Sequence, residues 1–264
     1  MNAFPESGEA DKVCMPQPVI FMHIPKTGGV TLRDVLMQNF TPDETYICDW
    51  PQKKEIEKLN NLTTEQKSRI KLYVGHIGYN QGIHRIFPGN PKYITIMRDP
   101  VSRVFSYYHY ILRDNPSHPL CVKAKRENLN FFELLVSNLQ NEVVRRFEMQ
   151  NMVLIDALEL AKKAFREHFI FVGLLERFDE SVILLKRILN LKTTFYAPKN
   201  TSPRKNYIQE ISNEQRNYII SQNYYDILLY NYAKELFDQS MNDHSEDFYR
   251  EVEQFKMLNM NYLY

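Results

Sequence analysis

The sequence predicts an α/β domain with a central parallel sheet flanked by helices and with a helical C-terminal part. Short apolar runs of strand length alternate with stretches whose apolar residues recur at helical spacing, and this alternation is typical of parallel sheets. The strand-like runs cover residues 18–24, 72–74, 92–97 and 169–172. No repeat, low-complexity tract or linker rich in Pro, Gly or Ser divides the chain. We therefore expect one domain over residues 17–264, behind a flexible leader at residues 1–16.

The N-terminal half supplies most of these strands and the helices between them. The run 18–24 stops at Pro25, and after a glycine turn the apolar residues recur at helical spacing. Residues 52–70 are charged, with apolar residues spaced for one amphipathic helix. After the third strand, Asp99 suits the N-cap of a helix and Pro100 its first turn.

From residue 127 onward the chain is expected to be mainly helical. Residues 127–190 carry apolar residues at helical spacing, interrupted by the strand-like run 169–172. Ser212 and Gln215 form a capping-box pattern ahead of further helices. The sheet is therefore expected to end before the C-terminal third.

Composition excludes several classes of protein. The 33 Lys and Arg against 32 Asp and Glu give a net charge of +1, so no global field attracts nucleic acid or an anionic membrane. The mean hydropathy is −0.46, and no apolar run approaches the roughly 20 residues of a membrane span. The N-terminus has no signal-peptide pattern. The three cysteines lie far apart, which argues against a disulfide framework or a cysteine zinc site: Cys14, Cys48 and Cys121. We expect a cytoplasmic protein, and the oligomeric state is left open.

A glycine turn between the first strand and the first helix predicts an anion site. Backbone N–H groups and the positive end of the helix dipole converge on such a turn. Lys26 adds a positive charge there, and Thr27 and Thr31 add hydroxyl groups. The lysine precedes Gly28 and Gly29, so this is not the Walker A pattern, and a nucleoside triphosphatase is disfavoured. The structural alternative is a tight connection with a solvated lysine.

Three sequence blocks carry a family resemblance. Residues 23–29 read His-Ile-Pro-Lys-Thr-Gly-Gly, and the other two blocks are residues 98–108 and 171–181. They resemble, in order, the 5′-phosphosulfate loop, the 3′-phosphate motif and a downstream signature of the carbohydrate-type sulfotransferases. That family uses 3′-phosphoadenosine 5′-phosphosulfate (PAPS) and includes the heparan sulfate and dermatan uronyl 2-O-sulfotransferases. The resemblance runs from about residue 18 to 240 and implies the P-loop-like sulfotransferase fold.

The resemblance implies two sets of PAPS contacts. Arg98 and Ser106 would hold the 3′-phosphate, although Arg98 could instead pair with a carboxylate. A late basic loop with Arg204 and Lys205 could also touch the nucleotide, and a solvated linker is its alternative. The loop that would hold the 5′-phosphosulfate consists of Lys26, Thr27, Gly28, Gly29, Val30 and Thr31. Val30 departs from the Ser or Thr that many members have, which puts one side-chain contact in doubt.

A general base is expected at His76, because this residue follows a strand and Gly75 and so lies at the same sheet edge as the phosphate turn. The resemblance gives the catalytic role to this Gly-His position, while the alternative is a histidine that only bonds the glycine loop. Val74 replaces the first histidine of the family's His-Gly-His, which weakens a transfer of the uronic-acid substrate. Lys26 would stabilise the charge of the transferring group. No metal is expected.

The sequence therefore predicts a sulfotransferase that moves the sulfonyl group of PAPS to an acceptor hydroxyl by in-line displacement. The acceptor would be a carbohydrate or a small metabolite, and the product adenosine 3′,5′-bisphosphate (PAP). Two alternatives stay open, a P-loop-type kinase that uses ATP with magnesium and a catalytically inactive nucleotide-binding scaffold. No nucleic-acid or membrane partner is expected.

Overall fold

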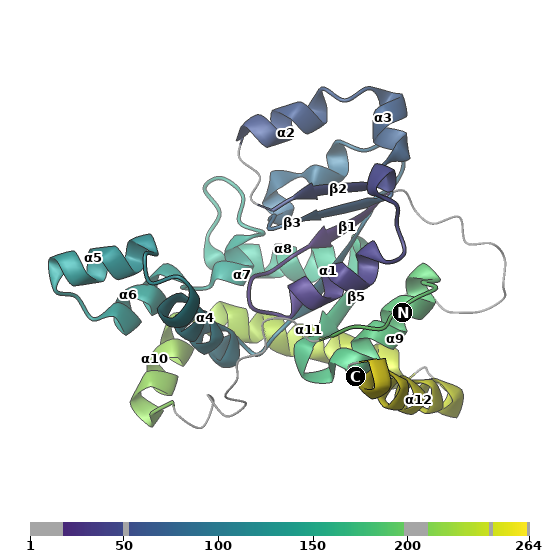
Figure 1. The fold of residues 1–264 in the computed structure, drawn as a ribbon. Helices are drawn as coiled ribbons and strands as arrows, with labels where there is room; N and C mark the ends of the chain where they lie inside the picture. The colour runs from purple at the N-terminus through teal and green to yellow at the C-terminus, as the bar shows by residue number, and fades with distance from the viewer. Residues whose placement is uncertain (1–17, 50–52, 198–210, 243–244, 263–264) are drawn as a thin grey trace.

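The computed structural model describes residues 18–49, 53–197, 211–242 and 245–262. At its centre lies a parallel sheet of five strands in the order β2-β3-β1-β4-β5 (Figure 1). The strands are β1 (Val19–Met22), β2 (Thr45–Cys48), β3 (Leu72–Gly75), β4 (Lys92–Met97) and β5 (Phe169–Leu174). The predicted fold class is confirmed. The expected leader at 1–16 lies outside the described residues.

Helices cover both faces of the sheet, as parallel strands require. The chain leaves β1 through α1 (Gly29–Met37) toward one edge and enters β5 from α8 (Leu154–Glu167) at the other edge. Because strand crossovers are right-handed, these two helices must lie on opposite faces. Figure 1 shows α1 in front of the sheet and α8 behind it. The central strand β1 is buried along its whole length, which explains its unbroken apolar sequence.

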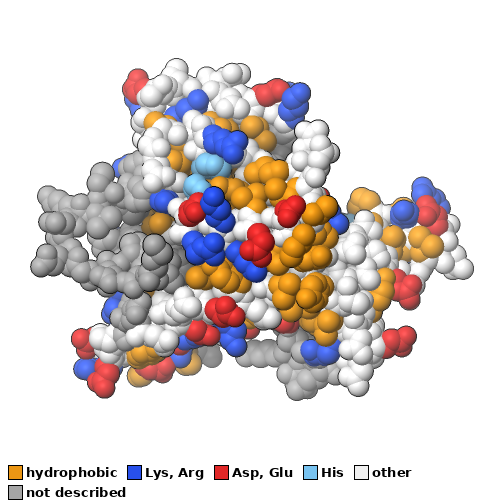
Figure 2. Space-filling model, turned by 180° about the vertical axis from the view of Figure 1, so that it is seen from behind, with side chains coloured by type: hydrophobic (Ala, Val, Ile, Leu, Met, Phe, Trp, Pro, Cys, Tyr) orange, Lys and Arg blue, Asp and Glu red, His pale blue; other side chains and the backbone are white. Residues whose placement is uncertain are grey.

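The remaining helices lie around the sheet and beyond its edges. They are α2 (Lys53–Asn60), α3 (Thr64–Arg69), α4 (Pro100–Asp114), α5 (Pro119–Glu127), α6 (Phe131–Asn138), α7 (Glu142–Arg145), α9 (Phe178–Leu189), α10 (Asn213–Gln222), α11 (Tyr224–Asn242) and α12 (Glu246–Tyr262). The C-terminal part is helical as predicted. Figure 2 shows the back of the molecule, where basic and acidic side chains lie close to one another.

Two parts of the prediction were wrong or incomplete. The single helix expected over residues 52–70 is two helices, α2 and α3, because Thr63 caps the second one. Its Oγ1 accepts from the backbone N–H of Gln66, whose side chain accepts in return from the Thr63 N–H. This capping box is a helix start, and it breaks the continuous helix. The edge strand β2 was not predicted.

The first turn of α4 is fixed by an N-cap and by ion pairs. Asp99 is its N-cap and accepts from the backbone N–H of Ser102, as predicted. Arg103, whose side chain is 1% exposed, pairs with Glu142 at 2.7 Å and with the buried Asp226 at 3.4 Å. These contacts tie α4 to α7 and α11. Beyond them, α4 packs with α5, α6 and α10 around a second, smaller core.

Candidate active site

The candidate site lies at the carboxyl edge of the sheet, where the loops after β1, β3 and β4 meet. In open α/β sheets this edge is where ligands bind. Met22 at the end of β1 pairs with Gly75 at the end of β3, so the next residues, His23 and His76, are neighbours. Their ring centroids are 4.1 Å apart. The topology therefore brings the phosphate turn and the candidate base to one place.

The turn after β1 contains two residues with left-handed backbone. Lys26 and Gly28 both lie in the left-handed region, with φ of 68° and 82°. A Cβ at Gly29 would lie 2.1 Å from Cδ2 of His23, and one at Gly28 would lie 2.6 Å from Cδ1 of Leu175. Packing against the His23 ring thus requires glycine at position 29, while at position 28 the positive φ favours glycine. Because α1 begins at Gly29, its first N–H groups and the positive end of its dipole face this loop.

Arg98 joins the second sequence block to this loop. Its guanidinium donates a hydrogen bond to the carbonyl oxygen of Lys26 at 3.1 Å, across 72 residues of sequence. Burial lowers the pKa of Arg98, and the carboxylate of Glu176 raises it. The guanidinium stays charged, because arginine does not deprotonate in proteins. The guanidinium of the second motif therefore contacts the main chain of the phosphate turn.

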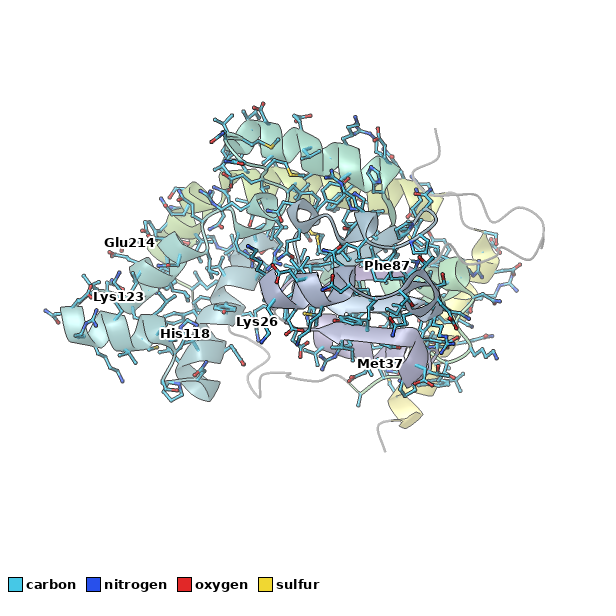
Figure 3. The ribbon with its side chains drawn as sticks, turned by 90° about the horizontal axis from the view of Figure 1, so that it is seen from above. Lys26, Met37, Phe87, His118, Lys123 and Glu214 are labelled. Atoms are coloured by element: carbon cyan, nitrogen blue, oxygen red, sulfur yellow. The ribbon has the colours of Figure 1, made fainter. Side chains whose placement is uncertain are left out.

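The side chain of Lys26 reaches α4. Its Nζ lies 4.2 Å from the centroid of the Tyr110 ring, which is a cation–π contact. Ser106 precedes Tyr110 by four residues, so both occupy the same face of α4. Figure 3 shows Lys26 in the region between α1 and α5, the helix that carries Lys123 and is capped by His118. The half-buried Ser106 is therefore on the side of α4 that faces the loop.

The geometry of His76 fixes its tautomer. Its Nδ1 lies 2.8 Å from the carbonyl oxygen of His23. A carbonyl can only accept, so Nδ1 carries the hydrogen and Nε2 carries the lone pair in the neutral ring. Burial lowers the pKa of His76, and its bond to His23 raises it by a smaller amount. A neutral imidazole with its lone pair on Nε2 is the form that a general base needs.

Sequence reasoning missed one charge beside the histidines, that of Arg146. This side chain donates to the carbonyl oxygen of Ile77 at 2.9 Å and pairs with Glu142. Its positive charge contributes to lowering the pKa of both His23 and His76. Burial is the main cause for His23, whose pKa falls to about 3. The only sequence signal was the pair of basic residues at 145–146, which looks the same as a solvated helix face.

The third sequence block covers the loop. Leu175 lies where a side chain on Gly28 would have to go. The next residue, Glu176, accepts from the backbone N–H of Asp99 at 2.9 Å and from the hydroxyl of Tyr230 at 3.0 Å. All three blocks that the sequence singled out are thus in contact with one another.

The other predicted ligands divide into three groups. The hydroxyl of Thr27 donates to the carbonyl of Ile24 at 2.8 Å, so its proton is used within the turn. Val30 is half-buried and Thr31 is buried, both in the first turn of α1. Arg204 and Lys205 lie outside the described residues.

Within the described ranges, no group of three or more His, Cys, Asp or Glu is placed to hold a metal ion. None of the helices that the structure describes is long and apolar enough to cross a membrane.

Comparison with known proteins decides the family. The sulfotransferase family matches residues 12–233 of this sequence. This chain belongs to the sulfotransferase family. A sulfotransferase-family enzyme was the prediction from the three blocks, and it is confirmed.

Among curated sulfotransferases, heparan sulfate 2-O-sulfotransferase hst-2 of Caenorhabditis elegans is 24% identical over 192 residues, covering 64% of this chain and 59% of that protein. Human heparan-sulfate 6-O-sulfotransferase 2 is 24% identical over 303 residues, covering 91% of this chain and 48% of that protein. The chain thus spans about half the length of the curated relatives it matches. Among solved structures, mouse sulfotransferase SULT7A1 complexed with PAP aligns with a TM-score of 0.46 and 15% identity, covering 91% of this chain and 88% of that one.

Proposed function

We propose that this sulfotransferase transfers the sulfonyl group of PAPS to a hydroxyl group of a carbohydrate or a small metabolite and releases PAP. The observation that carries the proposal is the hydrogen bond from Arg98 to the carbonyl of Lys26. It supports a single site in which Lys26 faces the 5′-phosphosulfate and Arg98 faces the 3′-phosphate of the nucleotide. The family match supports the reaction class.

The donor groups fit a doubly phosphorylated adenosine. At the 5′ end, the turn offers Lys26 and the N-terminus of α1, whose N–H groups bind anions. At the 3′ end, Arg98 has five N–H donors, and the contact to the loop uses one of them. Ser106 adds a hydroxyl on the face of α4 that faces the loop. Among the described residues, these cations are the groups that would balance the phosphate charge.

Each residue then has one task. Bound PAPS supplies the sulfonyl group, whose sulfur forms a bond to the acceptor oxygen as its bond to the 5′-phosphate oxygen breaks. His76 takes the proton of the acceptor hydroxyl on Nε2. Lys26 stabilises the negative charge that develops on the leaving phosphate oxygen. Arg98 and Ser106 hold the 3′-phosphate and so fix the nucleotide along the sheet edge.

The class of acceptor is drawn from the relatives. Two of them are named for sulfation of heparan sulfate, one at a 2-O and one at a 6-O position. Their different positions support a sugar hydroxyl in general and favour neither position for this chain. A small metabolite with a hydroxyl group is the second candidate.

Thermal-shift titration separates the nucleotide hypotheses. PAP, ADP and ATP with magnesium are each added to the same protein, and we expect PAP to give the largest rise in melting temperature. A ligand at 100 times its dissociation constant stabilises a protein by about 2.7 kcal/mol. The variant Arg98→Met should lose the preference of PAP over ADP, because the 3′-phosphate loses its guanidinium partner.

Transfer of label from ³⁵S-PAPS to a panel of saccharides and small hydroxyl compounds then tests the chemistry, with and without EDTA. Label transfer that EDTA does not affect supports the sulfotransferase. Equal stabilisation by ATP with magnesium would favour the kinase. PAP binding without transfer to any acceptor would favour the inactive scaffold.

A further inference from the structure

Lys26 is held at its backbone as well as at its side chain. Its φ of 68° is in the left-handed region, which residues with a Cβ rarely adopt. Arg98 donates to its carbonyl oxygen at 3.1 Å and so fixes the peptide in this conformation. At the other end, the Nζ lies 4.2 Å from the centroid of the Tyr110 ring. This is the shortest cation–ring distance among the described residues.

Tyr110 belongs to a helix that cannot easily move. The N-cap of Asp99 and the buried ion pairs of Arg103 fix the start of α4. Tyr110 lies two turns beyond Arg103 on the same helix. The backbone that carries its ring is therefore fixed, whereas lysine has a flexible four-carbon stem.

An aromatic ring suits this position better than a carboxylate would. A carboxylate beside the ammonium of Lys26 would cancel its charge and repel the phosphosulfate group. The face of a tyrosine ring attracts a cation through its quadrupole and adds no net negative charge. The contact can thus orient the ammonium and leave its charge for the nucleotide.

We propose that Tyr110 is a positioning residue, whose ring holds the Lys26 ammonium where it meets the leaving oxygen of the nucleotide. The inference rests on the proposed function for the role of Lys26. Tyr110 acts through Lys26 and does not itself touch the reacting atoms. It is the ring, and not the hydroxyl, that the contact uses.

The first test needs no nucleotide. Reductive methylation with ¹³C-formaldehyde labels the lysine amines and keeps their positive charge, and a methyl group above an aromatic ring resonates upfield. We expect one upfield-shifted signal that Lys26→Met removes. It should disappear in Tyr110→Leu and remain in Tyr110→Phe. The matched control is Tyr232→Leu, which removes a tyrosine ring 5.9 Å from Lys162 on another helix and should leave the signal unchanged.

The second test separates catalysis from binding. Tyr110→Leu should lower kcat roughly tenfold, the scale of one cation–π contact, and change the Kd of PAP by less than about threefold. Tyr110→Phe should keep kcat within about twofold of the wild type, because it retains the ring. A Tyr110→Leu variant with the wild-type methyl signal or the wild-type kcat would overturn the proposal. So would a Tyr110→Phe variant as slow as Tyr110→Leu, since the hydroxyl would then be the active group.

The outcome for the proposed function is read separately. If the wild-type protein binds no PAP and transfers no label, the proposed function fails, whatever the methyl signal shows. If the wild type is active and Tyr110→Leu has the wild-type methyl signal and kcat, only the proposed role of Tyr110 is rejected. Melting temperatures of all variants show whether each one is folded.

Discussion

The Nδ1 atom of His76 lies 2.8 Å from the carbonyl oxygen of His23, and this contact decides which nitrogen of His76 can accept a proton. The two residues are neighbours because Met22 and Gly75, directly before them, are paired in the sheet. The proposed base is thus oriented by the backbone that leads from β1 into the phosphate turn. A main-chain carbonyl is a fixed partner that no side-chain substitution removes.

Replacing His76 by alanine should lower kcat by about 100-fold or more, the usual contribution of a positioned general base. The Kd of PAP should change little, because none of the nucleotide-binding groups is removed. Transfer from ³⁵S-PAPS measures the first quantity and isothermal titration with PAP the second. Turnover at the wild-type rate would move the base to another residue.

The pH profile of kcat/KM should show an acid limb with its midpoint below 6.5. Burial lowers the pKa of His76 in the free protein, and the positive charge of Arg146 lowers it further. The base works only when neutral, so the rate rises as the pH passes upward through this pKa. Arg146→Gln should move the limb to higher pH.

The charge-conserving variant Arg146→Lys is the matched control for that shift. It should leave the limb near its wild-type position, because a positive charge remains beside the two histidines. A limb that Arg146→Gln does not move would show that another group controls the profile.

His23 should make the fold less stable in acid. Burial lowers the pKa of His23 to about 3, whereas the histidine of the unfolded chain takes up a proton near 6.5. Between these two values the unfolded state binds more protons, so stability falls as the pH falls, by at most about 1.4 kcal/mol per pH unit. Above 6.5 both states are neutral and the effect is absent. Urea unfolding at pH 7.5 and 4.5 should give a larger loss for the wild type than for His23→Gln; equal losses would contradict this assignment.

The substitution Gly29→Ala should destabilise the protein, although alanine normally favours a helix over glycine. The new Cβ would lie 2.1 Å from Cδ2 of His23, whose ring lies beside the rings of Phe21 and His76. Overpacking of this kind costs about 1–3 kcal/mol. Urea unfolding measures the stability, and PAP affinity should fall with it because the loop is displaced.

A second variant tests the cause of that loss. His23→Ala combined with Gly29→Ala removes the ring that the new methyl group would strike, so part of the stability lost in Gly29→Ala should return. If the double variant loses as much free energy of unfolding as the two single variants lose together, or more, the clash is excluded as the cause.

Buried strands were predictable from the sequence, and the exposed one was not. The short apolar run predicts a strand from Lys92 to Met97, and β4 has these bounds. The edge strand β2 has only four residues, three of them partly or fully exposed, so it lacks the apolar run that marks the inner strands. The break between α2 and α3 was visible as Thr63 and Gln66, but the helical spacing of the apolar residues before it suggested one helix: Ile56, Leu59 and Leu62.

The motif residues could be identified from sequence, while their contacts could not. Lys26, His76 and Arg98 follow strands that share one sheet edge, and spacing is enough to place them there. The partner of Arg98 within the loop is a main-chain carbonyl, which has no sequence signature. Tyr110 was one of several tyrosines on its helix, and only the packing of α4 against the loop distinguishes it.

Leu175, just past the last strand, fills the space beside Gly28 near the start of the chain. During synthesis, residue 28 leaves the ribosome long before residue 175 does. We expect the nascent loop to remain open until β5 has joined the sheet and brought Leu175 against it. The proposed affinity for the nucleotide would then arise as one of the last events of maturation, and incomplete chains would lack it.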